Sequence, residues 1–338
     1  MKKRKILFLF TELSDYFLAS INAGTRFFEI TIVHYEVNKE APFEFEDNNH
    51  VHFYVYQDLP SLKLITQLSA PDLVICSGWS NNDYIKLMKT ISDPIKRVIV
   101  MDNHWKNTLT QVLGVVYFKL FLRPIFSKIW VPGPPQVEFA KRLGFSNDQI
   151  YDKFYVANPK NFSPEIKLGS KKIIYVGRYL EWKGIYEMFG AFVKFYNSGH
   201  MDWELHCVGV GELWKEKIIH PGIIHHGFIQ PNELQKLIKK MTFFILPSHY
   251  EAWGVVVHEM AMSGLVLLLS DKIGAASSFL VDGQNGFTFK SKSQDAIIGV
   301  LNQISNLSSL DIQQMSIKSI EYSKGISQND FINVLNIL

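Results

Sequence analysis

Two alternating hydrophobic periods restrict what this chain can fold into. Short apolar runs rich in β-branched and aromatic residues are separated by longer segments whose apolar residues follow helical spacing, such as residues 185–196. Strands and helices in alternation predict parallel, doubly wound α/β sheets. The predicted strands of a first series are residues 6–10, 30–35, 51–56, 72–76, 97–101, 128–131 and 154–157. A second series comprises residues 171–176, 203–208, 223–228, 242–246 and 265–269.

The two series predict two domains of similar architecture. Residues 158–170 carry Asn, Pro, Ser and Gly without periodicity, which is typical of a connection. We therefore expect a first domain over residues 1–160, a linker over 161–170 and a second domain over 171–338. The final helices either stay in the second domain or pack back on the first. Ligands of doubly wound sheets bind beyond the carboxyl ends of the strands, so residues that follow strands are the candidates.

Composition excludes several classes of protein. The chain has 338 residues, 47% of them hydrophobic and 20% charged, which rules out a disulfide scaffold, a fibre or a disordered tail. A net charge of +3 argues against a nucleic-acid partner. The whole basic surplus lies before residue 169.

The two cysteines, the N-terminal sequence and residues 112–131 together predict a cytoplasmic protein. Cys76 and Cys207 each end an apolar run, which favours buried free thiols in a reducing compartment. The apolar run behind the basic N-terminus, residues 6–10, is too short for a signal peptide. Residues 112–131 are apolar but contain Lys119, Arg123 and Lys128, so they make a poor membrane span.

The densest set of candidate residues follows the predicted strand 242–246. Glu251 lies in the loop, Gly254 is a hinge into a helix that stops at Gly264, and Glu259 lies about a turn and a half into that helix. The backbone N–H groups of Trp253, Gly254 and Val255 then suit a phosphate. Beside such an anion, carboxylates suit hydrogen bonds from sugar hydroxyls. The alternative is a surface Glu and a second Glu that only complements the helix dipole.

Further candidates follow other predicted strands. Gly177, Arg178 and Lys183 follow residues 171–176, and the two cations match a pyrophosphate, although surface cations are usually just solvated. Gly209 and Gly211 follow residues 203–208 and form either a tight turn or a ligand contact. His104 follows residues 97–101 and is either a structural histidine or a donor to a sugar or phosphate oxygen.

Several chemistries find no motif. The sequence has no zinc-type Cys and His cluster, no G-x-S-x-G, no phosphate-binding G-x-x-x-x-G-K and no D-x-D pair. No glycine fingerprint follows the first strand, so a nicotinamide enzyme is not expected. We expect neither a metal nor another cofactor.

Glu251 and Glu259 form an E-x7-E pattern that resembles retaining glycosyltransferases of the GT-B fold, family 4. Residues 158–164 resemble the linker of that family, residues 176–184 its Val-Gly-Arg and Lys-Gly loop, and residues 282–287 its closing Asp-Gly-x-x-Gly-Phe. Residues 208–212 and 226–229 resemble its nucleotide-side loops. The resemblance covers residues 158–289, and the first half only by topology.

The resemblance implies a role for each matching position. Arg178 and Lys183 would hold the donor diphosphate as leaving group, Glu251 would bind the donor sugar, and Glu259 would accept from the ribose hydroxyls. His104 would lie beside the sugar. The implied donor-binding residues are Gly177, Gly209, Gly211, Phe228, Trp253, Gly254, Val255 and Glu259. Fixed cations would then stabilise charge that develops on the diphosphate.

Some positions depart from the family pattern. A glycine pair near the phosphate is missing after the first strand, and Gly24 is expected to cap the helix over residues 16–22 instead. Ser278 stands where the family often has Glu, and Gly264-Leu265-Val266-Leu267 replaces Gly-Leu-Pro-Val. The first-domain contacts to acceptor and phosphate therefore depart from the pattern.

The resulting hypothesis is a retaining glycosyltransferase that moves a sugar from a nucleoside diphosphate sugar to a glycan or lipid-linked acceptor. Synthesis of surface polysaccharide, such as capsule, O-antigen or lipopolysaccharide, fits a cytoplasmic enzyme. The alternatives are a sugar-nucleotide epimerase of similar fold and a non-catalytic homologue that acts as a partner subunit. Residues 112–130 are either a core helix plus strand or a segment on the inner face of the membrane.

Overall fold

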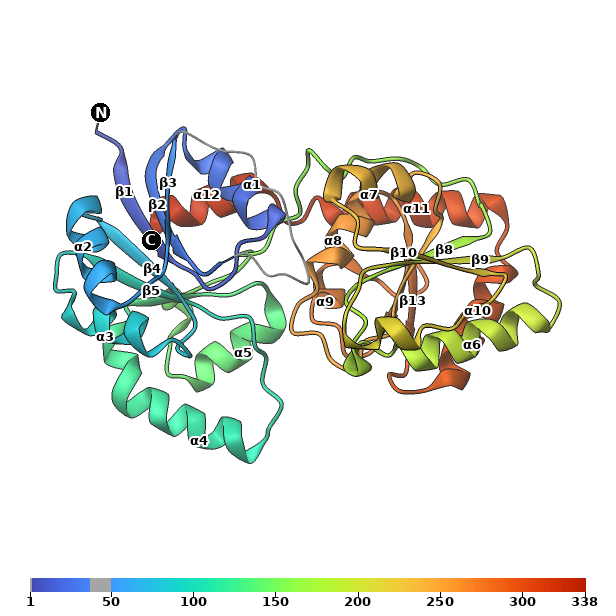
Figure 1. The fold of residues 1–338 in the computed structure, drawn as a ribbon, viewed down its shortest axis with the longest axis horizontal. Coiled ribbons are helices and arrows are strands. Elements are labelled where there is room, and N and C mark those ends of the chain that lie inside the picture. Colours follow the sequence, from blue (N-terminus) through green and yellow to red (C-terminus); the bar gives the residue numbers. More distant parts are fainter. Residues whose placement is uncertain (1, 37–49) are drawn as a thin grey trace. The chain divides into compact units, whose positions relative to one another are not determined.

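The computed structural model describes residues 2–36 and 50–338, which form two compact units (Figure 1). The first unit comprises Met1–Val156 and Ile326–Leu338, and the second comprises Ala157–Gly325. The chain thus passes between the units twice. The segment expected as a linker belongs to the second unit, and of the final helices only α12 (Gln328–Ile337) belongs to the first.

A parallel sheet forms the centre of the first unit. Within the described residues it has seven strands in the order β3-β2-β1-β4-β5-β6-β7. The strands are β1 (Arg4–Leu9), β2 (Phe28–His34), β3 (Val51–Val55), β4 (Leu73–Ser77), β5 (Lys96–Val100), β6 (Lys128–Trp130) and β7 (Ile150–Tyr151). Ile6 pairs with Ile30 on one side and with Leu73 on the other, and the strand is buried from Ile6 to Leu9. This agrees with the predicted doubly wound sheet.

Helices cover this sheet. They are α1 (Asp15–Gly24), α2 (Leu59–Ser69), α3 (Asn82–Thr90), α4 (Leu109–Tyr117), α5 (Pro134–Arg142) and α12. The ring of Phe331 on α12 lies 4.7 Å from the Trp130 ring, and Asp330 pairs with Lys153 at 3.0 Å. Aromatic burial therefore fixes the last helix on the first unit, although it is distant in sequence.

Two sequence predictions about the first unit are wrong. Residues 154–157 are not a strand, because Lys153 adopts a left-handed conformation that ends the pairing, and Phe154 is apolar because it packs on Trp130. Gly24 does not cap α1 from outside. It is the last helical residue, and Thr25 is the cap.

The second unit contains another parallel sheet, with six strands among the described residues in the order β10-β9-β8-β11-β12-β13. These are β8 (Lys172–Val176), β9 (Glu204–Val208), β10 (Ile223–Gly227), β11 (Phe243–Leu246), β12 (Val266–Ser270) and β13 (Gly286–Phe289). Its helices are α6 (Ile185–Asn197), α7 (Pro231–Ile238), α8 (Val255–Met262), α9 (Ala276–Phe279), α10 (Gln294–Ser305) and α11 (Ser309–Ser323). The predicted fold class is confirmed for both units. The short edge strand β13 was not predicted from the sequence.

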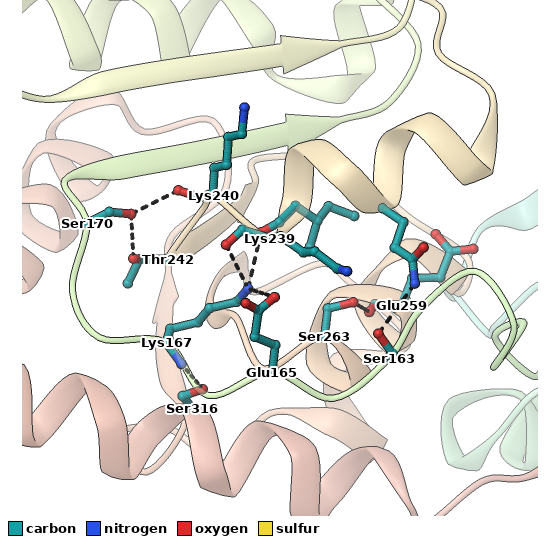
Figure 2. Close-up of polar contacts among 12 residues, drawn as sticks. Ser163, Glu165, Lys167, Ser170, Lys239, Lys240, Thr242, Glu259, Ser263 and Ser316 are labelled. Carbon is teal, nitrogen blue, oxygen red and sulfur yellow. Dashed lines mark hydrogen bonds and ion pairs between the residues drawn. The ribbon is translucent and has the colours of Figure 1, made fainter.

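A buried lysine anchors the segment that enters this sheet (Figure 2). Lys167 donates to the backbone carbonyls of Ile238 at 3.2 Å and Lys239 at 3.4 Å, and it pairs with Glu165 at 3.4 Å. Its backbone N–H donates to the hydroxyl of Ser316 at 2.9 Å. Burial lowers the pKa of Lys167, and the carbonyls at the end of α7 compensate its charge. Because of these contacts, the segment expected as a linker is packed against the second unit.

His258 on α8 joins the two places where the chain leaves the second unit. Its Nδ1 accepts from the backbone N–H of Ala157 at 3.1 Å, and its Nε2 lies 3.0 Å from the carbonyl of Ser323. These contacts require the neutral tautomer with the proton on Nε2. Burial lowers the pKa of His258 from 6.5 to about 4.

The His258 contacts predict an acid-sensitive connection. Because the folded pKa lies below the ordinary value, protonation opposes folding, so the stability is complete above about pH 6.5 and is lost as pH falls towards 4. Between pH 7 and pH 4.5 the free energy of unfolding of the wild type should fall by about 2 kcal/mol more than that of His258→Gln. Urea unfolding at both pH values measures this. Equal losses in both proteins would contradict the assignment.

Residues 112–131 divide into an exposed and a buried part. The expectation of a core helix plus strand holds for the strand β6 and for Phe118, Leu122 and Phe126, which are buried. It is wrong for α4, which has no buried residue. Among the described residues, no helix has the length and apolarity needed to cross a membrane. Cys76 and Cys207 are free and buried, as expected.

Candidate functional site

Loops at the carboxyl edge of the second sheet bring Lys183 and Glu251 together. Lys183 follows β8 and Glu251 follows β11, and these strands are neighbours. The Lys183 ammonium forms an ion pair with Oε2 of Glu251, and their side chains are only 14% and 20% exposed. The Ser248 hydroxyl donates to the same oxygen at 3.3 Å. The structure therefore joins two residues that the sequence placed in separate motifs.

Glycines permit this close approach. Gly184 has a φ of +69°, and a Cβ there would lie 2.3 Å from the carbonyl oxygen of Pro247. The backbone N–H of His249 donates to the carbonyl of Trp182 at 2.7 Å, which ties the same two loops together. A side chain at position 184 would push these loops apart.

The predicted glycines after β8 and β9 also contact backbone. A Cβ at Gly209 would lie 2.1 Å from the carbonyl oxygen of Gly177, and one at Gly211 would lie 2.6 Å from that of Tyr179. The loops after β8 and β9 are thus packed on one another. These contacts explain why both positions are glycine, and contact of Gly209 and Gly211 with a ligand stays a prediction.

A buried tyrosine, Tyr175, supports the loop that carries Arg178. The hydroxyl of Tyr175 donates to the carbonyl of Arg178 at 2.9 Å, and a Cβ at Gly177 would come within 2.8 Å of that hydroxyl. Burial raises the pKa of Tyr175, so this donor keeps its proton. Arg178 itself is exposed at the edge of the sheet.

The loop after β12 holds the backbone of Glu251, which the sequence motifs did not reveal. The N–H of Glu251 donates to the carbonyl of Lys272, and the N–H of Gly274 donates to the carbonyl of Glu251, both at 3.0 Å. A Cβ at Gly274 would lie 2.1 Å from the carbonyl oxygen of Ala252. The strand-end rule could have found this loop, because β12 lies beside β11.

Two helices begin at this edge without a side-chain cap. Gly184 precedes α6 and Gly254 precedes α8, each in a left-handed conformation, and neither N-cap residue makes a side-chain hydrogen bond. The side chains of Trp253 and Val255 are buried, so these residues offer backbone groups to the loop. Uncapped helix N-termini favour anions.

The other predicted residues lie further from the ion pair in sequence. Glu259 is half-buried in the second turn of α8, where its carbonyl accepts from the Ser263 hydroxyl at 2.9 Å. Phe228 is half-buried directly after β10. His104 belongs to the first unit, between β5 and α4, and its carbonyl accepts from Nε2 of Gln111 at 2.9 Å. The roles of these three side chains remain predictions.

This edge combines charges and groups suited to a sugar phosphate. Arg178 and Lys183 are cations, and α6 and α8 present their N-termini. An ionised Glu251 accepts hydrogen bonds from hydroxyl groups, while Lys183 offsets its repulsion of an anion. Within residues 2–36 and 50–338, no group of three or more His, Cys, Asp or Glu is placed to hold a metal ion.

The approach of Gly184 to Pro247 predicts a specific steric effect. Gly184→Ala should lower the free energy of unfolding of the second unit by about 1 to 3 kcal/mol, because left-handed strain adds to a backbone clash. Gly283→Ala is the matched control, since Gly283 has a φ of +74° but nothing within 4 Å of its Cβ position. Chemical unfolding of both variants measures the difference. Equal effects would show that the Pro247 contact does not matter.

Comparison with known proteins identifies this unit. Residues 157–321 match the family model described as glycosyl transferases group 1. The chain is 28% identical over 128 residues to a glycogen synthase of Mycobacterium tuberculosis (strain CDC 1551 / Oshkosh), covering 36% of the chain and 30% of that protein. It is 26% identical over 180 residues to the capsular polysaccharide biosynthesis glycosyltransferase CapM of Staphylococcus aureus, covering 50% of the chain and 46% of CapM.

A solved structure extends the likeness to both units. A sucrose-phosphate synthase from Thermosynechococcus elongatus superposes with a TM-score of 0.77 at 13% identity, over 98% of each chain. At this identity the likeness shows the fold. The curated relatives are matched over less than half of their own length. The family match falls on the unit that carries Arg178, Lys183, Glu251 and Glu259, so residues 157–321 form a domain of the glycosyl transferases group 1 family.

Proposed function

We propose that this chain is a glycosyltransferase that takes a sugar from a nucleoside diphosphate sugar and transfers it to a glycan or lipid-linked acceptor. The ion pair of Lys183 with Glu251 between two uncapped helix N-termini carries the proposal. Cations and helix N-termini serve the diphosphate, and a carboxylate serves the sugar hydroxyls. The family membership of residues 157–321 supports the same assignment.

The proposed chemistry is stabilisation of the leaving group. Negative charge grows on the diphosphate as the glycosidic bond breaks, and Arg178 and Lys183, together with the N-termini of α6 and α8, balance it. Glu251, held at its backbone by the loop after β12, positions the sugar. Glu259 accepts from the ribose hydroxyls, and the backbone around Trp253 to Val255 binds the sugar or the distal phosphate. These two cations fill the role that a divalent metal fills elsewhere, so the proposal includes none.

The finer parts of the proposal concern stereochemistry and setting. The E-x7-E pattern supports retention of anomeric configuration, with His104 beside the transferred sugar. The likeness to CapM supports a role in surface polysaccharide synthesis. In that setting the protein acts in the cytoplasm, and its first unit makes peripheral contact with the inner face of the membrane.

A nucleotide screen tests donor binding. At a hundred times its dissociation constant, the right nucleotide should stabilise the folded state by about 2.7 kcal/mol and raise the melting temperature by about 5 °C or more. UDP, GDP, ADP and their sugars are compared by thermal shift. Lys183→Met should lose most of the shift, while Lys171→Met, which removes a cation paired with Asp202 before β8, should keep it. The absence of any shift would contradict the donor site.

Turnover tests the catalytic roles. Lys183→Ala or Glu259→Ala should lower turnover on the order of a hundredfold or more, as the loss of a positioned electrostatic group does. Release of nucleoside diphosphate from the donor found in the screen measures this, with Lys171→Ala as the control. Full activity in both variants would refute the site. Conversion of the donor sugar to an epimer without acceptor would support the epimerase instead.

A further inference from the structure

Helix α4 and the turn that follows it present an apolar surface to solvent. Leu109 is 83% exposed, Leu113 70% and Leu120 66%. The α4 surface also includes other exposed large apolar side chains, namely Val112, Val116, Tyr117 and Phe121. They recur at helical spacing, so they form one continuous side of the segment. In Figure 1, α4 lies at the margin of the first unit.

The opposite side of this segment is fixed to the unit. Phe118 and Leu122 are buried, and the Phe118 ring lies 4.9 Å from that of Trp79. Arg123 donates to the carbonyls of Gly144 at 2.9 Å and Phe126 at 2.7 Å. The helix is therefore anchored with its apolar side outwards, so the exposure does not come from a loose helix.

The charge of this segment has one sign. Residues 103–137 contain no Asp or Glu, and they contain Lys106, Lys119, Arg123 and Lys128. Arg123 and Lys128 donate to neighbouring parts of the unit, whereas Lys119 is exposed between Tyr117 and Leu120. An apolar helix side with cations and no carboxylates is complementary to an anionic lipid surface.

We infer that the α4 surface binds the anionic surface of a phospholipid bilayer, with the helix lying in the plane of the interface. The segment is too short to cross a bilayer, and an apolar side on a short helix is suited to lie in the plane of the interface. The inference rests on the peripheral contact in the proposed function and names its surface and its lipid class. It involves neither the donor site nor catalysis.

Vesicle binding tests the inference without any substrate. The full chain should sediment with vesicles of phosphatidylglycerol and bind vesicles of phosphatidylcholine at least about tenfold more weakly. Leu113→Glu with Leu120→Glu should lower the partition coefficient about tenfold or more. Lys119→Glu should weaken binding to phosphatidylglycerol only.

Matched variants on another helix give the control. Leu64 and Leu68 on α2 are 55% and 67% exposed, so Leu64→Glu with Leu68→Glu makes the same chemical change at similar exposure. This control should bind vesicles as the wild type does. All variants should keep the nucleotide-induced thermal shift, which separates lipid binding from the donor site.

Three results would overturn the inference: no binding of the wild type to anionic vesicles, equal binding to both lipids, or equal losses in the α2 control. A dimer that dissociates in the α4 variant, without lipid binding, would assign the surface to a second copy of the chain.

Discussion

The carbonyl oxygen of Pro247 occupies the place where any side chain at position 184 would begin. This contact lets the loops after β8 and β11 approach until Lys183 meets Glu251, and it sets α6 to start beside them. A parallel sheet alone brings strand ends to one edge, at a separation of several ångströms. Because Gly184 has no side chain, the two loops come close enough for the ion pair to form. The candidate site therefore depends on backbone geometry as much as on charged residues.

The strands around this site could be predicted from the sequence for a physical reason. Parallel strands that are buried on both faces consist mainly of apolar residues, so the sequence shows where each strand ends. Charged residues directly after a strand are then easy to identify. Arg178, Lys183 and Glu251 became candidates in this way, and the structure brings Lys183 and Glu251 together. The support of Glu251 by Lys272 and Gly274 was missed because it uses backbone groups, which leave no trace in side-chain chemistry. The buried contacts of Lys167 and His258 were missed because a polar residue in a sequence does not reveal its partners.

Predictions failed where apolar residues lie outside a strand or face solvent. Phe154 is apolar because it packs on Trp130 and Phe331, and the strand ends before it. Leu113 and Leu120 are apolar and exposed, although the same segment also contains the buried Phe118 and Leu122. An apolar residue in a sequence indicates that its side chain is removed from water when the protein functions. The residue type does not show whether the side chain is buried by other residues of the protein or by an external surface such as a membrane.

The two units consequently carry different kinds of surface. In the second, the carboxylate of Glu251 contacts Lys183 and Ser248, and its main chain is bonded to two backbone groups. In the first, an apolar helix faces outwards within residues 103–137, which contain Lys and Arg but no Asp or Glu. Balanced charges hold a small polar ligand in a fixed pose, because each group has one geometry. A surplus of one sign beside apolar side chains binds an extended surface, for which total charge and buried area matter more than pose. The first arrangement suits the proposed sugar nucleotide, and the second suits the lipid surface that we infer for α4.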